Sequence, residues 1–276
     1  MLISAKIDYR SGDHMARSIV KLYRYPVKGL TAESLTEIKL TREYGLAYDR
    51  EFALALGTTS FDPDHPEPLD KGFFLMLRNN ESLAALATRF DPATGTLTIV
   101  KSGKPVLSAN LATDVGRETV EIFFSNYVGA AAKGWPRVVR AEGHRFTDAS
   151  VMSPVMMRAV SAINLASVRA LENAVGAPVD PLRFRGNIYI EGLNPWEEFD
   201  WVNREVRIGT IAFRGLAKTP RCAAVNVNPQ TAERDLNLPK AIAQSFGHVN
   251  LGVYLETLGD GELQIGDVVG SRIDVQ

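Results

Sequence analysis

The sequence predicts a mainly β protein with some helix, an α+β fold rich in barrel-like sheet. Short runs of β-branched and aromatic residues recur between glycine and proline turns, and helical patterns are few. Strands and helices also do not alternate in the way that is typical of parallel α/β proteins. With 276 residues, 45% of them hydrophobic and 23% charged, the chain is long enough for one large or two modest soluble domains.

In the first half of the chain, strands are expected over residues 19–25, 35–40, 51–56 and 96–101. Pro26 ends the first of them, because proline cannot donate to a sheet ladder. Residues 61–71 contain three prolines and are expected to form a surface loop. A short helix is expected over residues 80–87. The mixed segment 120–139 contains a Gly-Trp-Pro sequence and is the predicted domain boundary.

The second half is expected to contain two helices among further strands. The first helix begins at Ser161, whose side chain suits an N-cap, and ends at Gly176. The second covers residues 239–246, with Pro239 in its first turn and Gly247 after its end. Strands are expected over residues 188–191, 206–209, 211–213, 223–227, 249–256, 262–265 and 268–273.

Composition excludes several classes of partner and site. A net charge of −1 provides no field for nucleic acid or an acidic membrane. One cysteine cannot form an internal disulfide, an all-cysteine zinc site or an iron–sulfur cluster. No stretch approaches the ~20 apolar residues of a membrane span. The N-terminal residues lack the apolar centre of a signal peptide, so we expect a cytoplasmic protein whose natural start is Met1 or Met15.

The single cysteine, Cys222, is the strongest chemical candidate. It follows Arg221, and a neighbouring cation favours the thiolate, which is both a nucleophile and a soft metal ligand. A free cysteine is also often only a small buried hydrophobe. A nucleophilic pair with His248 is a further alternative, although no local signature supports it. The four histidines show no metal-ligand spacing, and phosphate-loop and dinucleotide motifs are absent from the sequence.

Several basic and polar residues fall in loops at the ends of expected strands. Arginine side chains match phosphate oxygens, and lysine adds a point charge, so this group predicts an anion pocket beside the cysteine. The N–H groups of a helix that begins at Ser161 are expected to contribute to the same pocket. The residues are Lys28, Arg50, Arg183, Arg185, Asn187 and Arg221.

Four short motifs resemble, in order, those of MOSC-domain proteins, and more closely those of the amidoxime-reducing component family. They occupy residues 25–30 (Tyr-Pro-Val-Lys-Gly-Leu), 45–50 (Gly-Leu-Ala-Tyr-Asp-Arg), 184–188 (Phe-Arg-Gly-Asn-Ile) and 220–222 (Pro-Arg-Cys). The resemblance runs from about residue 19 to the C-terminus. It implies an N-terminal β-barrel-like domain over residues 17–132, followed by a MOSC-type β-barrel domain over residues 133–276.

The resemblance also implies a molybdenum cofactor (Mo-molybdopterin) and roles for particular residues. Cys222 matches the cysteine that supplies a thiolate to molybdenum, and Arg221 beside it completes the catalytic pair. Gly29, Gly186 and Pro220 depart from residues common in the family, and the resemblance implies that these departures cost individual cofactor contacts. The positions that match or adjoin cofactor-binding ones are Lys28, Gly29, Arg50, Ser161, Asn164, Arg185, Asn187, Pro220, Arg221 and Cys222.

The implied activity is that of a molybdenum-dependent oxidoreductase that reduces small N-oxygenated substrates. Its electrons are expected from a separate ferredoxin-, flavodoxin- or cytochrome-type protein, because one cysteine cannot hold an iron–sulfur cluster. One alternative is a molybdenum-cofactor carrier or sulfur-relay protein without turnover of its own. A second is a pyridoxal-phosphate-binding module, for which Lys28 is the first candidate for a Schiff base.

Overall fold

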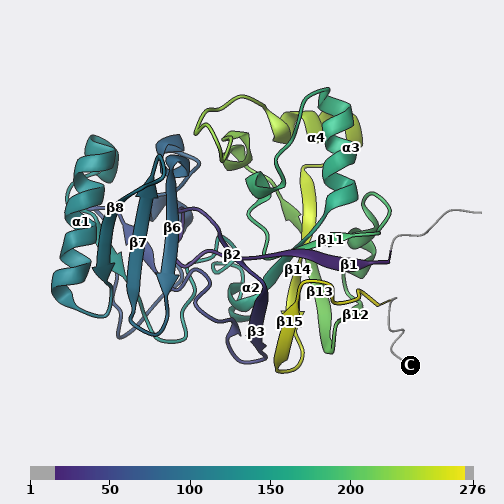
Figure 1. Ribbon diagram of the computed structural model, residues 1–276, viewed down its shortest axis with the longest axis horizontal. Helices are drawn as coiled ribbons and strands as arrows, with labels where there is room; N and C mark the ends of the chain where they lie inside the picture. Colours follow the sequence, from purple (N-terminus) through teal and green to yellow (C-terminus); the bar gives the residue numbers. More distant parts are fainter. Residues whose placement is uncertain (1–15, 271–276) are drawn as a thin grey trace, which may run out of the picture.

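The computed structural model describes residues 16–270, and its largest element is a seven-stranded sheet. The strand order is β12-β13-β14-β10-β11-β1-β2 (Figure 1). Neighbouring strands are antiparallel, except that β10 and β11 are parallel. The strands are β1 (Ser18–Arg24), β2 (Glu33–Leu35), β10 (Val160–Asn164), β11 (Ile188–Glu191), β12 (Glu205–Ile208), β13 (Ile211–Pro220) and β14 (Asn250–Thr257).

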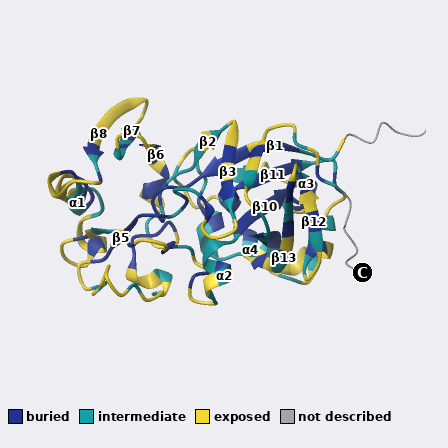
Figure 2. Ribbon diagram, turned by 90° about the horizontal axis from the view of Figure 1, so that it is seen from below, coloured by how far each residue is buried: buried dark blue, intermediate teal, exposed yellow. Residues whose placement is uncertain are grey.

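A smaller sheet shares an apolar core with one face of the large sheet. It contains β3 (Glu37–Thr41), β4 (Gly45–Leu46) and β15 (Gly261–Gln264) in the order β15-β3-β4. Ile38 and Leu263 from this sheet pack into one cluster with Leu22 and Phe213 from the large sheet. Figure 2 shows that the strands around this core are mostly buried.

Two helices pack against the opposite face of the large sheet. In β11, Ile188 and Ile190 belong to the core between the sheets, while Tyr189 belongs to the cluster under the helices. This alternation is expected of a strand that is buried on both faces. The helices are α3 (Leu165–Val175) and α4 (Leu238–Phe246).

The remaining strands form a separate layer, at the left of Figure 1. An antiparallel sheet of β6 (Leu86–Asp91), β7 (Thr96–Lys101) and β8 (Lys104–Asn110) packs on α1 (Asp114–Val128). Nearby, β5 (Ala53–Ala55) pairs with β9 (Arg137–Val139). The short helices are α2 (Pro154–Arg158), η1 (Lys71–Phe73), η2 (Glu81–Ala85), η3 (Gly129–Ala132), η4 (Pro181–Phe184), η5 (Glu197–Trp201) and η6 (Ala223–Asn226).

The prediction of a mainly β fold with some helix is confirmed, as are many of its elements. Strand β11 covers the residues predicted, and β12 and β13 pair about the turn at Gly209 as expected. Helix α3 ends at Gly176 in the left-handed conformation that favours glycine. Helix α4 and strands β14 and β15 also lie where the sequence placed them.

The predicted start of α3 is wrong. Ser161 lies inside β10, and the helix begins at Leu165, where the Asn164 side chain caps it by accepting from the N–H of Ala166 at 2.9 Å. All five residues of β10 are buried between β11 and β14. Sheet pairing therefore overrides the N-cap preference of Ser161.

Three further predictions need correction. Residues 223–227 are not a strand, because they begin with the 3₁₀ helix η6. The predicted helix over residues 80–87 is the 3₁₀ helix η2, and its last residues already belong to β6. Helix α1 was missed, although Val120 and Phe124 on its buried face have the i, i+4 spacing of a helix.

Some expectations lie outside the described residues or at their edge. The natural start at Met1 or Met15 and the end of the predicted strand 268–273 fall outside residues 16–270. Within that range, no helix is long and apolar enough to cross a bilayer.

Candidate functional site

A cleft of about 400 Å³ lies between residues from the two halves of the chain. Cys222 lines it, and so do residues from all four sequence motifs. Segments near residues 28, 50 and 76 contribute one part of the wall, and segments near residues 148, 160, 185, 221 and 254 contribute the other part. Of the predicted site residues, those lining the cleft are Lys28, Gly29, Arg50, Ser161, Arg183, Arg185, Asn187, Pro220, Arg221 and Cys222.

Cys222 lies at the turn that follows β13, directly before η6. It is a free, half-buried cysteine. The carbonyl of Cys222 accepts from the N–H of Val225 at 3.1 Å, and Pro220 pairs with Asn250 at the start of β14. The thiol is therefore held on a short, hydrogen-bonded turn at the cleft wall.

Arg221 fixes this turn through backbone contacts. Its Nε donates to the carbonyl of Leu251 at 2.8 Å, and its Nη1 donates to the carbonyl of Phe184 at 2.8 Å. Its Nη2 also donates to the Leu251 carbonyl. The guanidinium thus joins the cysteine turn to β14 and to the loop that carries Arg185, and its donors are largely occupied.

Arg183 also braces the cysteine turn, although the sequence suggested an anion-binding role. Its Nη2 contacts both carboxylate oxygens of Asp235 at 2.7 Å, and its Nη1 donates to the carbonyl of Asn226 at 3.0 Å. Only 1% of the Arg183 side chain is exposed. Its charge is already balanced within the protein.

Arg50 and Arg185 flank the ring of Tyr25. Their guanidinium carbons lie 4.1 Å and 4.5 Å from the ring centroid, within the range of a cation–π contact. Arg50 pairs with Asp49 and donates to the carbonyl of Arg185 at 2.8 Å. Both arginines have a positive φ, 49° and 52°, which non-glycine residues adopt rarely and which recurs at functional sites.

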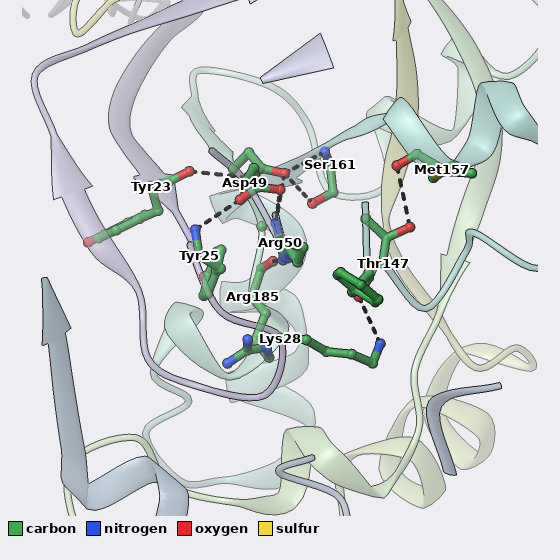
Figure 3. Close-up of polar contacts among 12 residues, drawn as sticks. Tyr23, Tyr25, Lys28, Asp49, Arg50, Thr147, Met157, Ser161 and Arg185 are labelled. Carbon is green, nitrogen blue, oxygen red and sulfur yellow. Dashed lines mark hydrogen bonds and ion pairs between the residues drawn. The ribbon is translucent and has the colours of Figure 1, made fainter. Parts of the chain in front are cut away.

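Arg185 differs from Arg50, Arg183 and Arg221 because its side chain has no hydrogen-bonding or ion-pairing partner among the described residues. Within residues 16–270, its side chain has no hydrogen bond and no ion pair, and Figure 3 draws it beside Tyr25 with no contact line. Burial lowers the pKa of the Arg185 guanidinium, although Tyr25 opposes that shift. A desolvated cation without a counter-ion is a ready binding point for an anion.

Lys28 lies on the same wall, with its ammonium group buried. It donates to the carbonyl of Phe146 at 3.0 Å and pairs with the carboxylate of Asp148. Burial lowers the pKa of Lys28, and Asp148 opposes this shift. Burial would raise the pKa of Asp148, but Lys28 and Lys71 together lower it to about 2.

Asn187 links several parts of the site through hydrogen bonds. Its Oδ1 accepts from the N–H of Ser161 at 3.1 Å and from the Ser161 hydroxyl at 3.2 Å, and its Nδ2 donates to Asp49 at 3.1 Å. Since Asp49 pairs with Arg50, this network orients Arg50. The Asn187 side chain is 99% enclosed and has few donors left over.

Asn164 lies apart from this group. Its Nδ2 donates to the carbonyl of Asn194 at 2.7 Å and to Glu198 at 2.8 Å, and it is not among the residues that line the cleft. Glu198 is fully buried, and burial raises its pKa. The structure therefore places Asn164 in a network that caps α3.

Sequence reasoning missed several residues of the cleft. Lys71 and Asp148 carry charge, and Tyr254 on β14 carries a phenol. Their surroundings in sequence offered no signal, because Lys71 closes a proline-rich loop and Tyr254 lies in an ordinary strand. Apolar side chains complete the wall, among them Met76, Met152 and Met156.

The polar groups of the cleft suit a metal ion that is already bound to another ligand. Among the described residues, no group of three or more His, Cys, Asp or Glu side chains is placed to hold a metal ion. The cleft offers one thiol, an unpaired guanidinium, and enough volume for a small organic group. These features fit a metal carried by an anionic organic ligand, such as the molybdenum cofactor.

Comparisons with known proteins identify the family of both parts of the chain. Residues 16–135 match the family model described as the MOSC N-terminal beta barrel domain, and residues 141–270 match the model described as the MOSC domain. A molybdenum cofactor sulfurase from Anopheles gambiae is 31% identical over 202 residues, which cover 63% of this chain and 26% of that protein. One from Drosophila grimshawi is 25% identical over 273 residues, which cover 92% and 34%.

The chain therefore spans between 26% and 34% of the length of these two curated relatives. Among solved structures, the YUAD protein from Bacillus subtilis aligns with a TM-score of 0.45 and 11% sequence identity. That alignment covers 92% of this chain and 94% of the other.

Proposed function

The chain belongs to the MOSC-domain proteins, and we propose that it binds the molybdenum cofactor in its cleft and reduces small N-oxygenated molecules. One observation carries this proposal. The single cysteine lines the same cleft as Arg185, a half-buried guanidinium that has no partner among the described residues. When bound, the cofactor supplies two-electron oxygen-atom transfer chemistry at molybdenum.

The residues of the cleft divide into ligand, anion-binding and bracing groups. Cys222 would provide the thiolate for the metal. Arg185 would neutralise the phosphate, because guanidinium donors form strong charge-assisted hydrogen bonds with such groups. Arg50 and Lys28, which are paired with Asp49 and Asp148, would donate their remaining N–H groups to phosphate or pterin oxygens. Arg221 holds the cysteine turn in place through its bonds to the Leu251 and Phe184 carbonyls.

Asn187 orients rather than binds in this scheme, since its oxygen and nitrogen are already bonded to Ser161 and Asp49. Reduction of one N–OH group would consume two electrons and two protons. It would convert that group to an N–H group and release one water molecule. In this proposal the electrons would come from a separate electron-donor protein, because the one cysteine of the given sequence is assigned to molybdenum and cannot also hold an iron–sulfur cluster.

A direct test uses protein purified from a host that makes the cofactor, with a chemically reduced viologen dye as electron donor. Benzamidoxime should be converted to benzamidine, and the Cys222→Ala variant should lose the activity. Lys104→Gln, on the distant strand β8, is a control that should keep it. Molybdenum-loaded protein that binds but does not reduce any N-oxygenated compound would contradict the proposed activity.

A second candidate is cofactor sulfuration or transport, which the name of the curated relatives favours. In that case Cys222 would carry a persulfide or hold the cofactor without turnover. Mass spectrometry of the intact protein distinguishes the two, because a persulfide adds the mass of one sulfur atom at Cys222. The pyridoxal-phosphate alternative is not favoured, since the ammonium of Lys28 is engaged by Asp148 and Phe146.

A further inference from the structure

We infer that the cleft selects N-oxygenated substrates that also carry a carboxylate or similar anionic group, and that Lys71 and Arg78 determine this preference. The inference rests on the proposed function and specifies its substrate class. It depends on where positive charge in the cleft is balanced and where it is not.

The walls of the cleft carry far more basic than acidic side chains. Asp148 is the only carboxylate among its lining residues. The basic lining residues are Lys28, Arg50, Lys71, Arg78, Arg183, Arg185, Lys218 and Arg221.

Most of these cations already have partners. Arg50 pairs with Asp49, Arg183 pairs with Asp235, and Arg221 donates to backbone carbonyls. Lys218 lies over the ring of Phe199, with its ammonium 4.6 Å from the ring centroid. Arg185, beside Tyr25, is assigned to the cofactor phosphate. Lys28 pairs with Asp148. Of the eight basic lining residues, Lys71 and Arg78 are the two that remain.

Lys71 is only partly neutralised. Its ammonium lies 3.4 Å from Asp148, but the same carboxylate forms a shorter ion pair with Lys28. A single negative charge therefore serves two ammonium groups. The Lys71 side chain is 25% exposed, so it remains accessible from the cleft.

Arg78 has no acidic partner within residues 16–270. Glu81, three positions along the chain, pairs with Arg234 instead. Arg78 lines the same cleft as Lys71. Burial lowers the pKa of Lys71, Asp148 and Cys222 more than reverse this shift, and the charge of Arg78 lowers the pKa of Lys71 again. Among the described lining residues, the one carboxylate near these two cations is that of Asp148, which Lys28 shares.

The segment that carries both cations is held firmly against the cleft. The N–H of Leu75 donates to the carbonyl of Leu54 at 2.8 Å, and Arg234 donates to the carbonyls of Leu77 and Arg78. Met76 from this segment lines the cleft, as do Met152 and Met156 from across it. Flexible methionine side chains adapt to apolar groups of varied shape. The wall therefore suits a substrate with an apolar body and an anionic end.

A small molecule fits these charges better than an acidic partner protein does. Three quarters of the Lys71 side chain is enclosed, and its ammonium contacts Asp148 inside the cleft. The flat surface of a partner protein would reach Arg78 but not Lys71. The experiment must therefore distinguish binding of an anionic substrate from docking of an acidic electron-donor protein.

The test compares benzamidoxime with benzamidoxime that bears a 4-carboxylate, using reduced viologen as the electron donor. The variants are Lys71→Gln, Arg78→Gln and their double variant, with Lys104→Gln as a control that removes the same charge on β8. The wild type should reduce the carboxylated substrate with a kcat/KM about tenfold higher, as expected for two partly exposed charge pairs. The double variant should lose this preference and keep its kcat/KM for the neutral substrate and its molybdenum content.

Equal kcat/KM for both substrates in the wild type would overturn the inference. So would a double variant that loses activity on both substrates alike, or one that changes only with a protein electron donor. Calorimetric binding of 4-amidinobenzoate and benzamidine provides a readout without turnover. Tighter binding of the carboxylate, lost in the double variant, supports the inference even if neither amidoxime is reduced, and in that case the proposed function alone fails.

Discussion

Lys28 and Asp148, which are 120 residues apart in the sequence, form an ion pair at the cleft wall. Lys28 belongs to the region matched by the N-terminal family model, and Asp148 belongs to the region matched by the MOSC model. The pair therefore links the two parts of the chain at the point where the cofactor is proposed to bind. Several measurable consequences follow from this and from neighbouring contacts.

Asp148→Asn should destabilise the protein near neutral pH but not in acid. The pKa of Asp148 is lowered from 3.8 to about 2, so the ion pair contributes stability above about pH 4 and loses it as the pH falls toward 2. Because the Asp148 side chain is 49% exposed, solvent screening limits the contribution to about 1 kcal/mol. Urea unfolding at pH 7 and pH 3 measures it. A difference between wild type and variant that is equal at both pH values would count against the ion pair.

Arg185 and Arg183 are neighbours for which we predict opposite effects. Arg185→Gln should leave the free energy of unfolding of the cofactor-free protein unchanged or slightly higher, because it removes a desolvated charge without a counter-ion. Arg183→Gln should lower the free energy of unfolding by about 3 kcal/mol, because Asp235 and the Asn226 carbonyl lose their partner. Pterin content after purification should fall sharply for Arg185→Gln.

Thermal unfolding of the cofactor-free proteins checks both halves of this comparison. If Arg185→Gln were as destabilising as Arg183→Gln, Arg185 would be a structural residue, and its proposed role in binding the phosphate would be lost.

Gly186 should tolerate no larger residue while Ile163 is present. A Cβ atom at Gly186 would lie 2.3 Å from Cγ1 of Ile163, so Gly186→Ala should cost about 1–3 kcal/mol by overpacking. Ile163→Ala alone should cost about 2–5 kcal/mol through the cavity it leaves. The double variant should be less destabilised than the sum by more than about 1 kcal/mol. Additive effects in denaturant titrations would show that the two sites do not touch.

The same contact explains a departure noted in the sequence. Gly186 departs from the residue that the resemblance implies at this position, and its N–H donates to the Tyr189 hydroxyl at 3.2 Å. Proline would remove that donor and would add ring atoms next to Ile163.

Sequence patterns predicted the elements whose signals are local. The helix end at Gly176 and the turn at Gly209 follow from backbone preferences of single residues, and both were found. The start of α3 and the fold of residues 223–226 were predicted wrongly, because they depend on packing between distant strands. Ser161 is drawn into β10 by its pairing with Tyr254, 93 positions away by the numbering of the sequence.

The candidate site was predictable only in part, for a related physical reason. The motifs located Cys222 and the arginines, but a sequence does not show which cations are neutralised. Arg183 and Arg185 are alike in sequence, yet only Arg183 meets a carboxylate, supplied by Asp235. Asp148 and Lys71 lie in the cleft because of tertiary contacts, which the sequence does not show.

X-ray absorption at the molybdenum edge tests the central claim most directly. Protein from a cofactor-producing host would be compared with its Cys222→Ala variant. We predict that the wild type contains molybdenum with one more sulfur ligand than the variant, because the thiolate of Cys222 completes the metal's coordination. A wild type without molybdenum, or an identical sulfur shell in the two proteins, would contradict the assignment of Cys222 as the metal ligand.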